Sequence, residues 1–294
     1  MGKIIQEIQK GRVLVSDGAW GTFLQKKGLE SRECPEEWNI SRPDDVFDIA
    51  QSYIDAGADM IETNSFGGNY FKLKNYGFEN RVFEINKAAA EISRKAAGTN
   101  RFVLGSVGPT GKLLLMEEVT EEELYHAFKY QAIALEAGGA DAIVIETMTD
   151  LEEARIATRA AKENTACEVM CTMTFDKTLN GEYRTMMGIS PTEMVEILIA
   201  AGASVIGANC GNGIADMIGI VKEIRQINAE IPVLIHANAG MPQYCDGVTT
   251  FPESPENMAG RVKEIIDAGA NIIGGCCGTT PDHICEVRKV VRNL

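Results

Sequence analysis

The sequence predicts an α/β fold in which short apolar strands alternate with amphipathic helices along one domain. Its 294 residues, 45% of them hydrophobic, are enough for one large core. A glycine-containing element that leads into branched apolar residues occurs four times, at 56–61, 138–143, 201–206 and 268–273. In each copy the glycine is suited to end a helix, and the apolar run is suited to a buried strand. Each copy therefore predicts a helix-to-strand joint.

The remaining elements follow from short apolar runs and from amphipathic periodicity. We expect strands at 12–16, 58–63, 102–107, 141–146, 168–174, 203–209, 231–236 and 270–275. Helices are expected at 44–56, 81–97, 121–137, 150–163, 191–201, 214–228, 255–267 and 281–292. Ser41, Thr120 and Ser190 are the expected helix caps, Thr120 with Glu123 three residues later. Such alternation is typical of parallel βα units, and eight units predict a closed (β/α)8 TIM barrel over residues 1–294. A doubly wound open sheet is the alternative.

Charge and hydropathy restrict the class of partner. The chain has 28 basic and 42 acidic residues, a net charge of −14, which argues against nucleic acid or an anionic membrane as its main partner. No apolar run approaches the roughly 20 residues of a membrane-spanning helix, and the N-terminus lacks the apolar stretch of a signal peptide. We therefore expect a soluble, cytoplasmic protein. Eight cysteines in such a protein point to metal binding or catalysis rather than to disulfides.

Polar and glycine-rich segments follow nearly every expected strand. In parallel architectures, functional residues gather at the carboxyl ends of the strands. The segments at those ends are 17–22, 62–68, 108–111, 146–147, 209–213, 236–240 and 276–278. The opposite strand ends carry no such residues. This asymmetry predicts a single site on one face of the fold.

The adjacent residues Cys276 and Cys277 are the most specific feature of that face. Successive side chains on a strand point to opposite faces, so the backbone must leave the strand for both sulfurs to converge, and the flanking glycines permit this. Cys210 has a similar setting. Three thiolates would hold zinc with a fourth position open. The alternatives are that the three cysteines only pack in the core, or that Cys34 or Cys245 competes as a ligand. The other cysteines are expected to pack in the interior: Cys167, Cys171 and Cys285.

A zinc ion with three thiolate ligands favours sulfur chemistry. Its complex already carries negative charge, so it would be poor at making hydroxide. Coordination deprotonates a substrate thiol, and the thiolate is the nucleophilic form of sulfur. The cysteine pattern therefore favours alkyl transfer to a thiol over hydrolysis.

Two carboxylates, Asp17 and Glu146, end apolar strands, where an unpaired charge is costly. A cationic substrate amine would satisfy them, and Glu62 is a weaker candidate for the same role. Asp17 could instead cap the turn after the first strand. His236, at the end of the seventh strand, is a further candidate for ligand contact. The remaining histidines are expected to lie on the surface or to be structural: His126 and His283.

The chain resembles the homocysteine S-methyltransferase family over nearly its whole length. Its Gly-Gly-Cys-Cys-Gly-Thr-Thr-Pro-Asp-His-Ile run at 274–284 carries the most specific part of the resemblance. The other matching segments are 17–22, 57–66, 108–111, 146–147, 209–210 and 238–240. The segments 62–66 and 238–242 are most similar to the N-terminal module of cobalamin-dependent methionine synthase.

This resemblance implies a barrel with zinc on Cys210, Cys276 and Cys277, and homocysteine as the methyl acceptor. It further implies that Asp17 and Glu146 hold the substrate amino group and that Asn238 lies beside the zinc. Because the chain stops shortly after the last expected helix, we expect no cobalamin site of its own. The expected methyl donor is a separate methylated corrinoid protein. The alternatives are S-methylmethionine or betaine as donor, another small thiol as acceptor, and a non-catalytic module for zinc storage or redox sensing.

Overall fold

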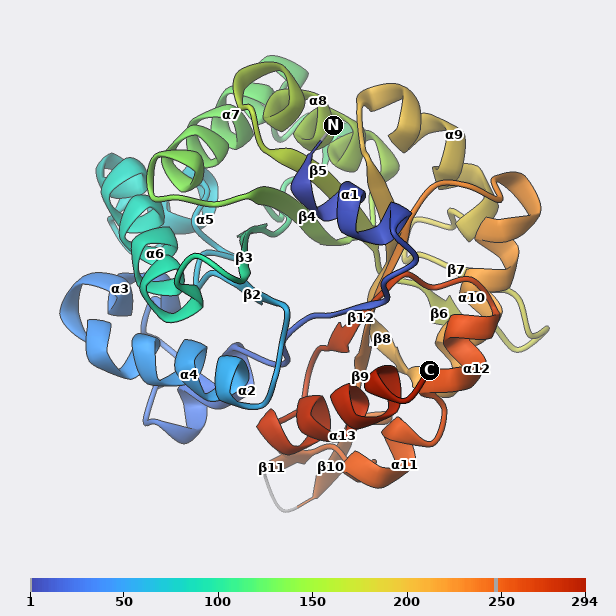
Figure 1. Cartoon of the computed structure of the whole chain (residues 1–294). Coiled ribbons are helices and arrows are strands. Elements are labelled where there is room, and N and C mark those ends of the chain that lie inside the picture. Colours follow the sequence, from blue (N-terminus) through green and yellow to red (C-terminus); the bar gives the residue numbers. More distant parts are fainter. Residues whose placement is uncertain (1, 246–247) are drawn as a thin grey trace.

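The computed structural model describes residues 2–245 and 248–294. Eight parallel strands form one sheet in the order β1-β12-β9-β8-β5-β4-β3-β2, and helices surround it (Figure 1). This order follows the chain around a ring, so the predicted (β/α)8 TIM barrel is confirmed and the doubly wound sheet is excluded. The strands are β1 (Leu14–Val15), β2 (Met60–Glu62), β3 (Phe102–Val107), β4 (Ala142–Met148), β5 (Glu168–Met173), β8 (Val205–Gly213), β9 (Val233–Asn238) and β12 (Ile272–Gly275).

Two aspartates close the ring between β1 and β2. Asp59 donates its backbone N–H to the Val15 carbonyl over 2.7 Å, and its carboxylate accepts the N–H of Val15 over 3.0 Å. Nearer the carboxyl ends of the strands, the Asp17 carboxylate accepts the N–H of Glu62 over 2.9 Å. Side-chain oxygens thus satisfy backbone donors along this seam, where an orphaned N–H would be costly.

Most of the predicted helices are present within one or two residues of their expected bounds. They are α4 (Pro43–Asp55), α6 (Val82–Ala97), α7 (Glu121–Ala137), α8 (Leu151–Asn164), α9 (Pro191–Ala201), α10 (Ile214–Ile227) and α13 (Pro281–Arg292). The single helix predicted at 255–267 is wrong. The segment forms α11 (Pro255–Ala259) and α12 (Val262–Asp267), which are separated at Gly260, a residue with poor helix propensity.

Two of the three predicted caps are confirmed. Thr120 and Ser190 each form a capping box with the glutamate three residues later. The Ser41 cap is wrong, because a short helix, α3 (Trp38–Ser41), continues through that residue. The Ser41 hydroxyl donates to Glu37, and Arg42 occupies the cap position of α4.

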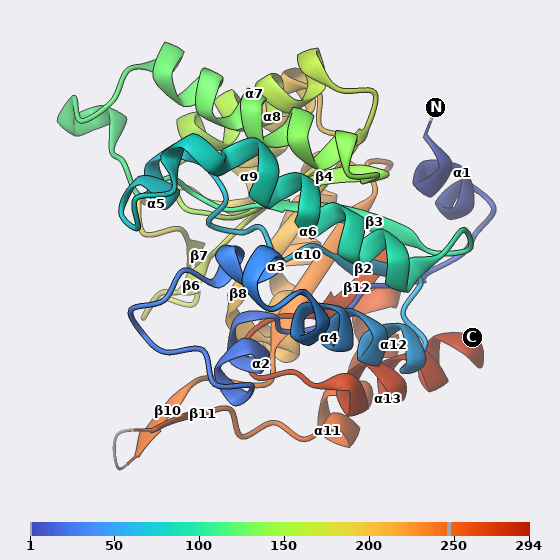
Figure 2. The same ribbon diagram turned by 90° about the vertical axis from the view of Figure 1, so that its left-hand side faces the viewer.

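Several short elements were not predicted. They are the helices α1 (Lys3–Gln9), α2 (Gly21–Lys26) and α5 (Tyr70–Lys74), the 3-10 turns η1 (Pro35–Glu37), η2 (Glu79–Arg81) and η3 (Leu114–Met116), and two hairpins, β6 (Asp176–Lys177) with β7 (Tyr183–Arg184) and β10 (Gln243–Cys245) with β11 (Val248–Thr250). Figure 2 shows both hairpins at the end of the barrel opposite to α1 and the C-terminus. No helix in residues 2–245 or 248–294 is long and apolar enough to cross a membrane.

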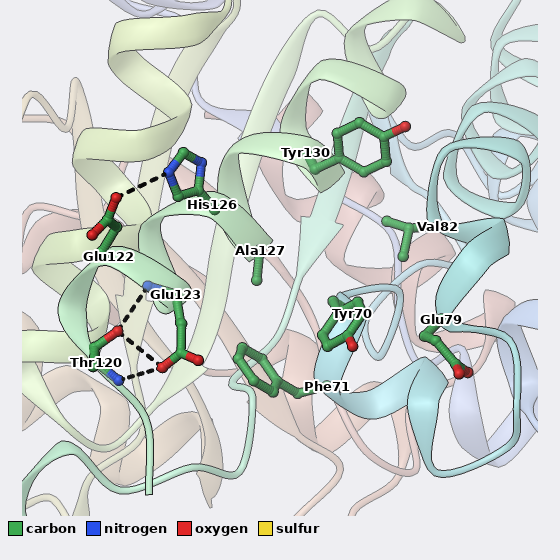
Figure 3. A pocket seen from close by; sticks show the side chains of 10 residues that line it. All are labelled: Tyr70, Phe71, Glu79, Val82, Thr120, Glu122, Glu123, His126, Ala127 and Tyr130. Atoms are coloured by element: carbon green, nitrogen blue, oxygen red, sulfur yellow. Dashed lines mark hydrogen bonds and ion pairs between the residues drawn. The ribbon is translucent and has the colours of Figure 1, made fainter. Parts of the chain in front are cut away.

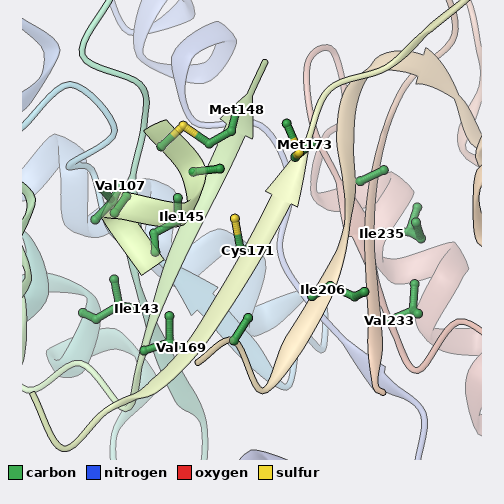
Figure 4. Close-up of a cluster of buried hydrophobic side chains, with 14 of the residues drawn as sticks. Val107, Ile143, Ile145, Met148, Val169, Cys171, Met173, Ile206, Val233 and Ile235 are labelled. Carbon is green, nitrogen blue, oxygen red and sulfur yellow. The ribbon is translucent and has the colours of Figure 1, made fainter. Parts of the chain in front are cut away.

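The buried apolar residues form two separate groups. The larger group lies between the strands and the surrounding helices, and Figure 4 shows part of it on β3, β4, β5, β8 and β9. The smaller group fills the lower barrel interior and is called the lower layer here. Its strand residues are Leu14, Met60, Leu104, Ala142, Val144, Met170, Val205, Leu234 and Ile272.

Helix α1 closes the barrel below the lower layer (Figure 1). Ile4 is fully buried against that layer. The Glu168 carboxylate accepts the N–H groups of Ile4 and Ile5 at the start of the helix, over 2.7 and 3.1 Å. An anion at a helix N-terminus is favourable, so this contact fixes α1 in place. The lower end is therefore closed, and the opposite end is left for a site.

Candidate metal and substrate site

The three cysteines predicted as ligands meet at the carboxyl ends of β8 and β12. The Sγ atoms of Cys210 and Cys277 lie 3.8 Å apart, and all three sulfurs, with Cys276, lie within 4.8 Å of one another. A tetrahedral zinc with Zn–S bonds of about 2.3 Å places its sulfur ligands about 3.8 Å apart. The cluster therefore has dimensions that fit such an ion.

The backbone leaves regular strand geometry at these cysteines. Strict alternation would point Cys210 outward, but its φ of 59° is left-handed, and the β8–β9 register shifts between Asn209 and Gly213. At β12, Gly274 leaves room for its neighbours. A Cβ there would lie 2.8 Å from the Ser16 Cβ, the Asp17 carbonyl oxygen and the His236 ring. These local departures turn the sulfurs into the barrel mouth.

Other groups around the sulfurs also suit a metal. Hydrogen bonds from Cys276 and Cys277 lower the pKa of the Cys210 thiol, so the cluster favours a thiolate. The Asn238 amide also lies beside Cys210, and its Oδ1 is buried without a hydrogen-bond partner. An orphaned buried oxygen next to three sulfurs is the kind of atom that a cation would satisfy.

The alternative ligands are not part of this cluster where the structure describes them. Cys34 donates to Glu36 on the outer side of the barrel mouth, and burial raises the pKa of its thiol to about 12. The side chain of Cys245 lies outside the described part of the chain. Cys167 and Cys171 are buried, as expected of packing residues, and Cys285 is half-buried.

Above the lower layer, the inward-facing positions of the strands carry polar side chains. This upper layer consists of Ser16, Glu62, Ser106, Glu146, Thr172, Asn209 and His236, all of them buried. In barrels of this kind, each strand alternates between inward and outward positions, so the two layers come from the same strands. The upper layer forms the floor beneath the three cysteines.

Asp17 is buried beside this layer and has local partners. Its carboxylate accepts hydrogen bonds from the Trp20 indole N–H and the Glu62 N–H, both over 2.9 Å. Burial raises the pKa of Asp17, and the neighbouring His236 opposes that rise. These two bonds tie the segment after β1 to β2, and neither is to a backbone N–H of the turn after the first strand, where the sequence offered a capping role for Asp17.

Glu62 and His236 face each other across the barrel interior. Nδ1 of His236 lies 3.3 Å from Oε1 of Glu62, without the alignment of a hydrogen bond. Burial and the charge of Asp17 raise the pKa of Glu62 well above its ordinary value. Burial lowers the pKa of His236. Nε2 of His236 is also buried without a partner, so this pair has unused hydrogen-bonding capacity.

Glu146 is the member of the floor whose charge acts on Cys277. The Ser106 hydroxyl donates to its Oε1, and Nδ2 of Asn209 lies 3.4 Å from its Oε2. Burial and then the charge of Glu62 raise the pKa of Glu146 well above its ordinary value. No lysine or arginine pairs with Glu62 or Glu146 among the described residues. A cation would stabilise this group of acids.

A cavity of about 270 Å³ joins the cysteines to these acids. Its wall includes all three cysteines, Glu62, Glu146 and His236, with apolar surface from Trp20, Leu24 and Phe66. Asp17 and Asn238 are not part of the lining. They lie behind it and act on the cavity through their neighbours. The cavity thus brings sulfur, carboxylate and apolar surface together in one space.

Sequence reasoning missed the supporting residues of this site. Ser106 and Thr172 interrupt apolar strands at inward positions, which is the signal that could have revealed them. Asn209 stands next to Cys210 in the sequence, but its contacts depend on β4 and β5. The hydrogen bond from Trp20 to Asp17 depends on the turn after β1.

A larger cavity of about 540 Å³ lies on the outer flank, between α5, α6 and α7 (Figure 3). One carboxylate oxygen of Glu79 in its wall is buried without a hydrogen-bond partner, but Glu122, Glu123 and His126 have structural partners or are exposed. Glu123 belongs to the capping box of Thr120, and the exposed His126 lies 3.8 Å from Glu122. This flank brings none of the candidate site residues together, which confirms the surface position expected for His126. His283 is structural as predicted, since it caps α13 with Thr280.

The chain matches a sequence family described as homocysteine S-methyltransferase over residues 14–291. It is 33% identical to methionine synthase from Mycobacterium tuberculosis over 98% of this chain, and 32% identical to methionine synthase from Mycobacterium leprae over 95%. The matched regions are 25% and 24% of those proteins. The chain therefore spans about a quarter of the length of these relatives.

Solved structures share the fold along the whole chain. The metallated form of a homocysteine methyltransferase from Escherichia coli superposes with a TM-score of 0.79 at 20% identity, covering 98% of this chain and 99% of that one. The apo form of the same enzyme gives a TM-score of 0.75 at 22% identity, covering 96% and 97%. This likeness supports the barrel architecture.

Proposed function

The chain belongs to the homocysteine S-methyltransferase family, and from that premise we propose that it methylates homocysteine to methionine. The observation that carries the proposal is the composition of one cavity. Its three sulfurs suit a metal that holds a thiol, and its unpaired carboxylates suit an amine. Homocysteine carries a thiol and an amino group at the two ends of a short apolar chain, as the cavity requires.

The proposed metal is zinc, held by Cys210, Cys276 and Cys277. When bound, zinc would lower the pKa of the substrate thiol and keep its sulfur as the nucleophilic thiolate. Asn238, whose side chain contacts Cys210 and whose Oδ1 is unpartnered, would lie beside it. No general base from the chain is then needed at the sulfur.

The proposed amine site consists of Glu62 and Glu146 in the cavity wall, with Asp17 behind them. All three are buried, and burial raises the pKa of each. A substrate ammonium group would favour their ionised forms and remove part of the cost of burying them. Trp20 and Phe66 would cover the methylene groups and exclude water.

The bond changes are those of a displacement at carbon. A lone pair on the homocysteine sulfur forms the new S–C bond to the donor methyl group. The bond between that methyl group and the donor breaks, and its electron pair stays on the donor. A methylated corrinoid can accept the pair on its cobalt, and a sulfonium donor can accept it on sulfur.

For the donor we propose a separate methylated corrinoid protein. Most of the exposed large hydrophobic side chains in the described part of the chain lie on loops around the barrel mouth, including Leu113, Leu115, Met116, Met186 and Met241. The exceptions are Ile227 and Leu294 near the opposite end, and Tyr70, Phe83 and Tyr130 on the helices of the outer flank. Concentrated exposed apolar surface is typical of protein contacts. A donor presented by a protein would cover this rim, whereas a small donor would leave it exposed.

The test is methionine formation by the purified, zinc-loaded protein. Homocysteine would be supplied in turn with a methylated corrinoid protein, free methylcobalamin, S-methylmethionine and betaine. We expect the corrinoid donors to give methionine. Transfer only from S-methylmethionine or betaine would contradict the donor assignment. No methionine from any donor, with one zinc bound, would contradict the proposed function and favour a role in zinc storage or redox sensing. Activity with other small thiols but not with homocysteine would change the acceptor.

A further inference from the structure

We propose that Asn209 is a positioning residue that couples the amine-binding end of the cavity to its sulfur end. The inference rests on the proposed function, because it assigns Asn209 to the binding of homocysteine. Asn209 is fully buried on β8, directly before Cys210. Its side chain contacts residues from β4 and β5 and the segment after β12, and these include one member of each proposed subsite.

The hydrogen bonds of the Asn209 amide fix its orientation. Oδ1 accepts the Thr147 N–H and the Thr172 hydroxyl, each over 2.7 Å. Nδ2 donates to the Thr147 hydroxyl over 2.7 Å. A flipped amide would place a donor against the Thr147 N–H, so the network allows only this orientation.

One N–H of Asn209 remains for the site. Both lone pairs of Oδ1 and one hydrogen of Nδ2 are used by Thr147 and Thr172. Nδ2 also lies 3.4 Å from Oε2 of Glu146 and 4.0 Å from Sγ of Cys276. The second N–H is therefore available to both a proposed amine-binding carboxylate and a proposed metal ligand. Hydrogen bonds to charged acceptors are stronger than those to neutral ones, so this N–H helps to fix the positions of both the carboxylate and the sulfur.

The same amide joins two backbone irregularities. Thr147 and Cys210 both have a φ of 59°, a left-handed conformation that is unfavourable for residues other than glycine. The β4–β5 register shifts between Ile145 and Met148, and the β8–β9 register shifts after Asn209. Such strain persists only where the surroundings hold it. Asn209 holds Thr147 at both its N–H and its hydroxyl, so it fixes Glu146 relative to Cys210.

This arrangement has a consequence for homocysteine. The amino group and the thiol of one substrate molecule must be satisfied together, and the spacing of their subsites is set through Asn209. Without the N–H of Asn209, each subsite would persist, but the distance between the two subsites would no longer be fixed. The affinity for a thiol would then increase less when the same molecule also carries an amino group.

The test compares homocysteine with 4-mercaptobutyrate, which has the same thiol and carboxylate but no amino group. Cobalt(II)-loaded protein would be titrated with each thiol, and binding read from the sulfur-to-cobalt absorption band, which needs no methyl donor. We expect the wild type to prefer homocysteine. Asn209→Asp keeps an acceptor for the Thr147 N–H but loses the N–H donors. It should reduce the preference roughly tenfold to a hundredfold, the range for a hydrogen bond to a charged group.

Asn212→Ala is the matched control. Asn212 is buried on the same strand, and its amide donates to the Phe175 carbonyl, away from the cavity. This variant should lose thermal stability but retain the wild-type preference. If Asn209→Asp fails to fold, Asn209→Ser is the second variant, since it also lacks the amide N–H, and the same reduction is expected.

The outcomes separate this inference from the proposed function. An Asn209 variant that retains cobalt and weakens both thiols equally, or neither, would overturn the inference and leave Asn209 a purely structural residue. A wild type that binds neither thiol would contradict the proposed function itself. A preference that falls in the Asn209 variants and not in Asn212→Ala would support the coupling.

Discussion

The lower and upper layers of the barrel interior come from the same strands, yet they differ in almost every physical property. The lower layer is apolar, fully buried and closed by Ile4 of α1. The upper layer, two residues further along most strands, consists of acids, amides, hydroxyls and a histidine. One stabilises the fold by removing apolar surface from water. The other places buried polar groups where a ligand can reach them.

The cost of the upper layer is visible in its unpartnered atoms. Glu62 Oε1 and His236 Nε2 are buried without hydrogen bonds, and so is Asn238 Oδ1 just above them. Buried polar groups without partners are destabilising by about 1–3 kcal/mol each. The lower layer has no polar side-chain atoms to satisfy. The contrast teaches that this barrel separates stability from function along its axis, with the closed end compensating for the open one.

The largest effect should come from Cys276→Ala at the top of the upper layer. Removing one of three ligands should abolish tight zinc binding and lower methyl transfer by about a thousandfold or more, because the substrate thiol would lose its means of ionisation. Folding should change little. Metal analysis, turnover and thermal unfolding measure the three quantities.

Cys171→Ala provides the matched control for this variant. Cys171 is fully buried on β5 in the apolar core, so its loss should cost about 1 kcal/mol of stability and leave one zinc bound. Zinc retained at one equivalent by Cys276→Ala would refute the ligand assignment. Loss of zinc from Cys171→Ala would show that the apolar core and the metal site are not independent.

The opposite result is expected for Leu234→Ala in the lower layer. Leu234 is fully buried, and truncating a buried leucine costs about 2–5 kcal/mol. Urea should therefore unfold this variant at a lower midpoint concentration than the wild type. Homocysteine affinity, measured well below the transition, should stay within about threefold of wild type, because the cavity contains no lower-layer side chain. A large loss of affinity in the folded variant would show that the two layers are not independent.

The smallest effect concerns pH. Burial raises the pKa of Glu146 and Asp17, and only their ionised forms attract the substrate ammonium. As pH falls through these raised values, the carboxyl groups take up protons and the preference for homocysteine over 4-mercaptobutyrate should fall. The decline should reach about tenfold per pH unit for one proton, and it should begin above the ordinary carboxyl range.

Glu146→Gln tests which group is responsible for the pH effect. It should weaken homocysteine binding at neutral pH and flatten the pH profile of the preference, while zinc remains bound. The ratio of the two thiols cancels effects on thiol ionisation. If the pH profile keeps its full slope in Glu146→Gln, then Asp17 or Glu62 is the group whose protonation causes the pH effect.

The fold could be predicted from sequence because its signals are local. The elements at 56–61 and 268–273 each join a helix to a buried strand in the structure, as their glycine and apolar run indicate. The short elements were missed because they depend on tertiary contacts. Helix α1, for example, is held by the carboxylate of Glu168, more than 160 residues away. The helix break at Gly260 was missed because amphipathic periodicity continues across a single glycine.

The site could be predicted in part for the same reason. Cys210, Cys276, Glu62 and Glu146 stand at strand ends, and a parallel barrel gathers strand ends at one mouth. Sequence did not distinguish groups that line the cavity from groups behind it, as Asp17 shows. It also did not reveal the role of Asn209, since its contacts reach residues 37 to 67 positions away in the sequence.

The seam between β1 and β2 limits how this protein can change over evolution. Asp17 supplies the acceptor for the Glu62 N–H, and it is also a proposed source of negative charge for the substrate. An asparagine at position 17 would keep a carbonyl acceptor and lose the charge, so the two duties are separable by one substitution. A homologue that no longer binds amine-bearing thiols could thus carry asparagine at position 17 and still keep the hydrogen bond that closes the barrel between β1 and β2. The residue at position 17 would then record which substrates selection has maintained.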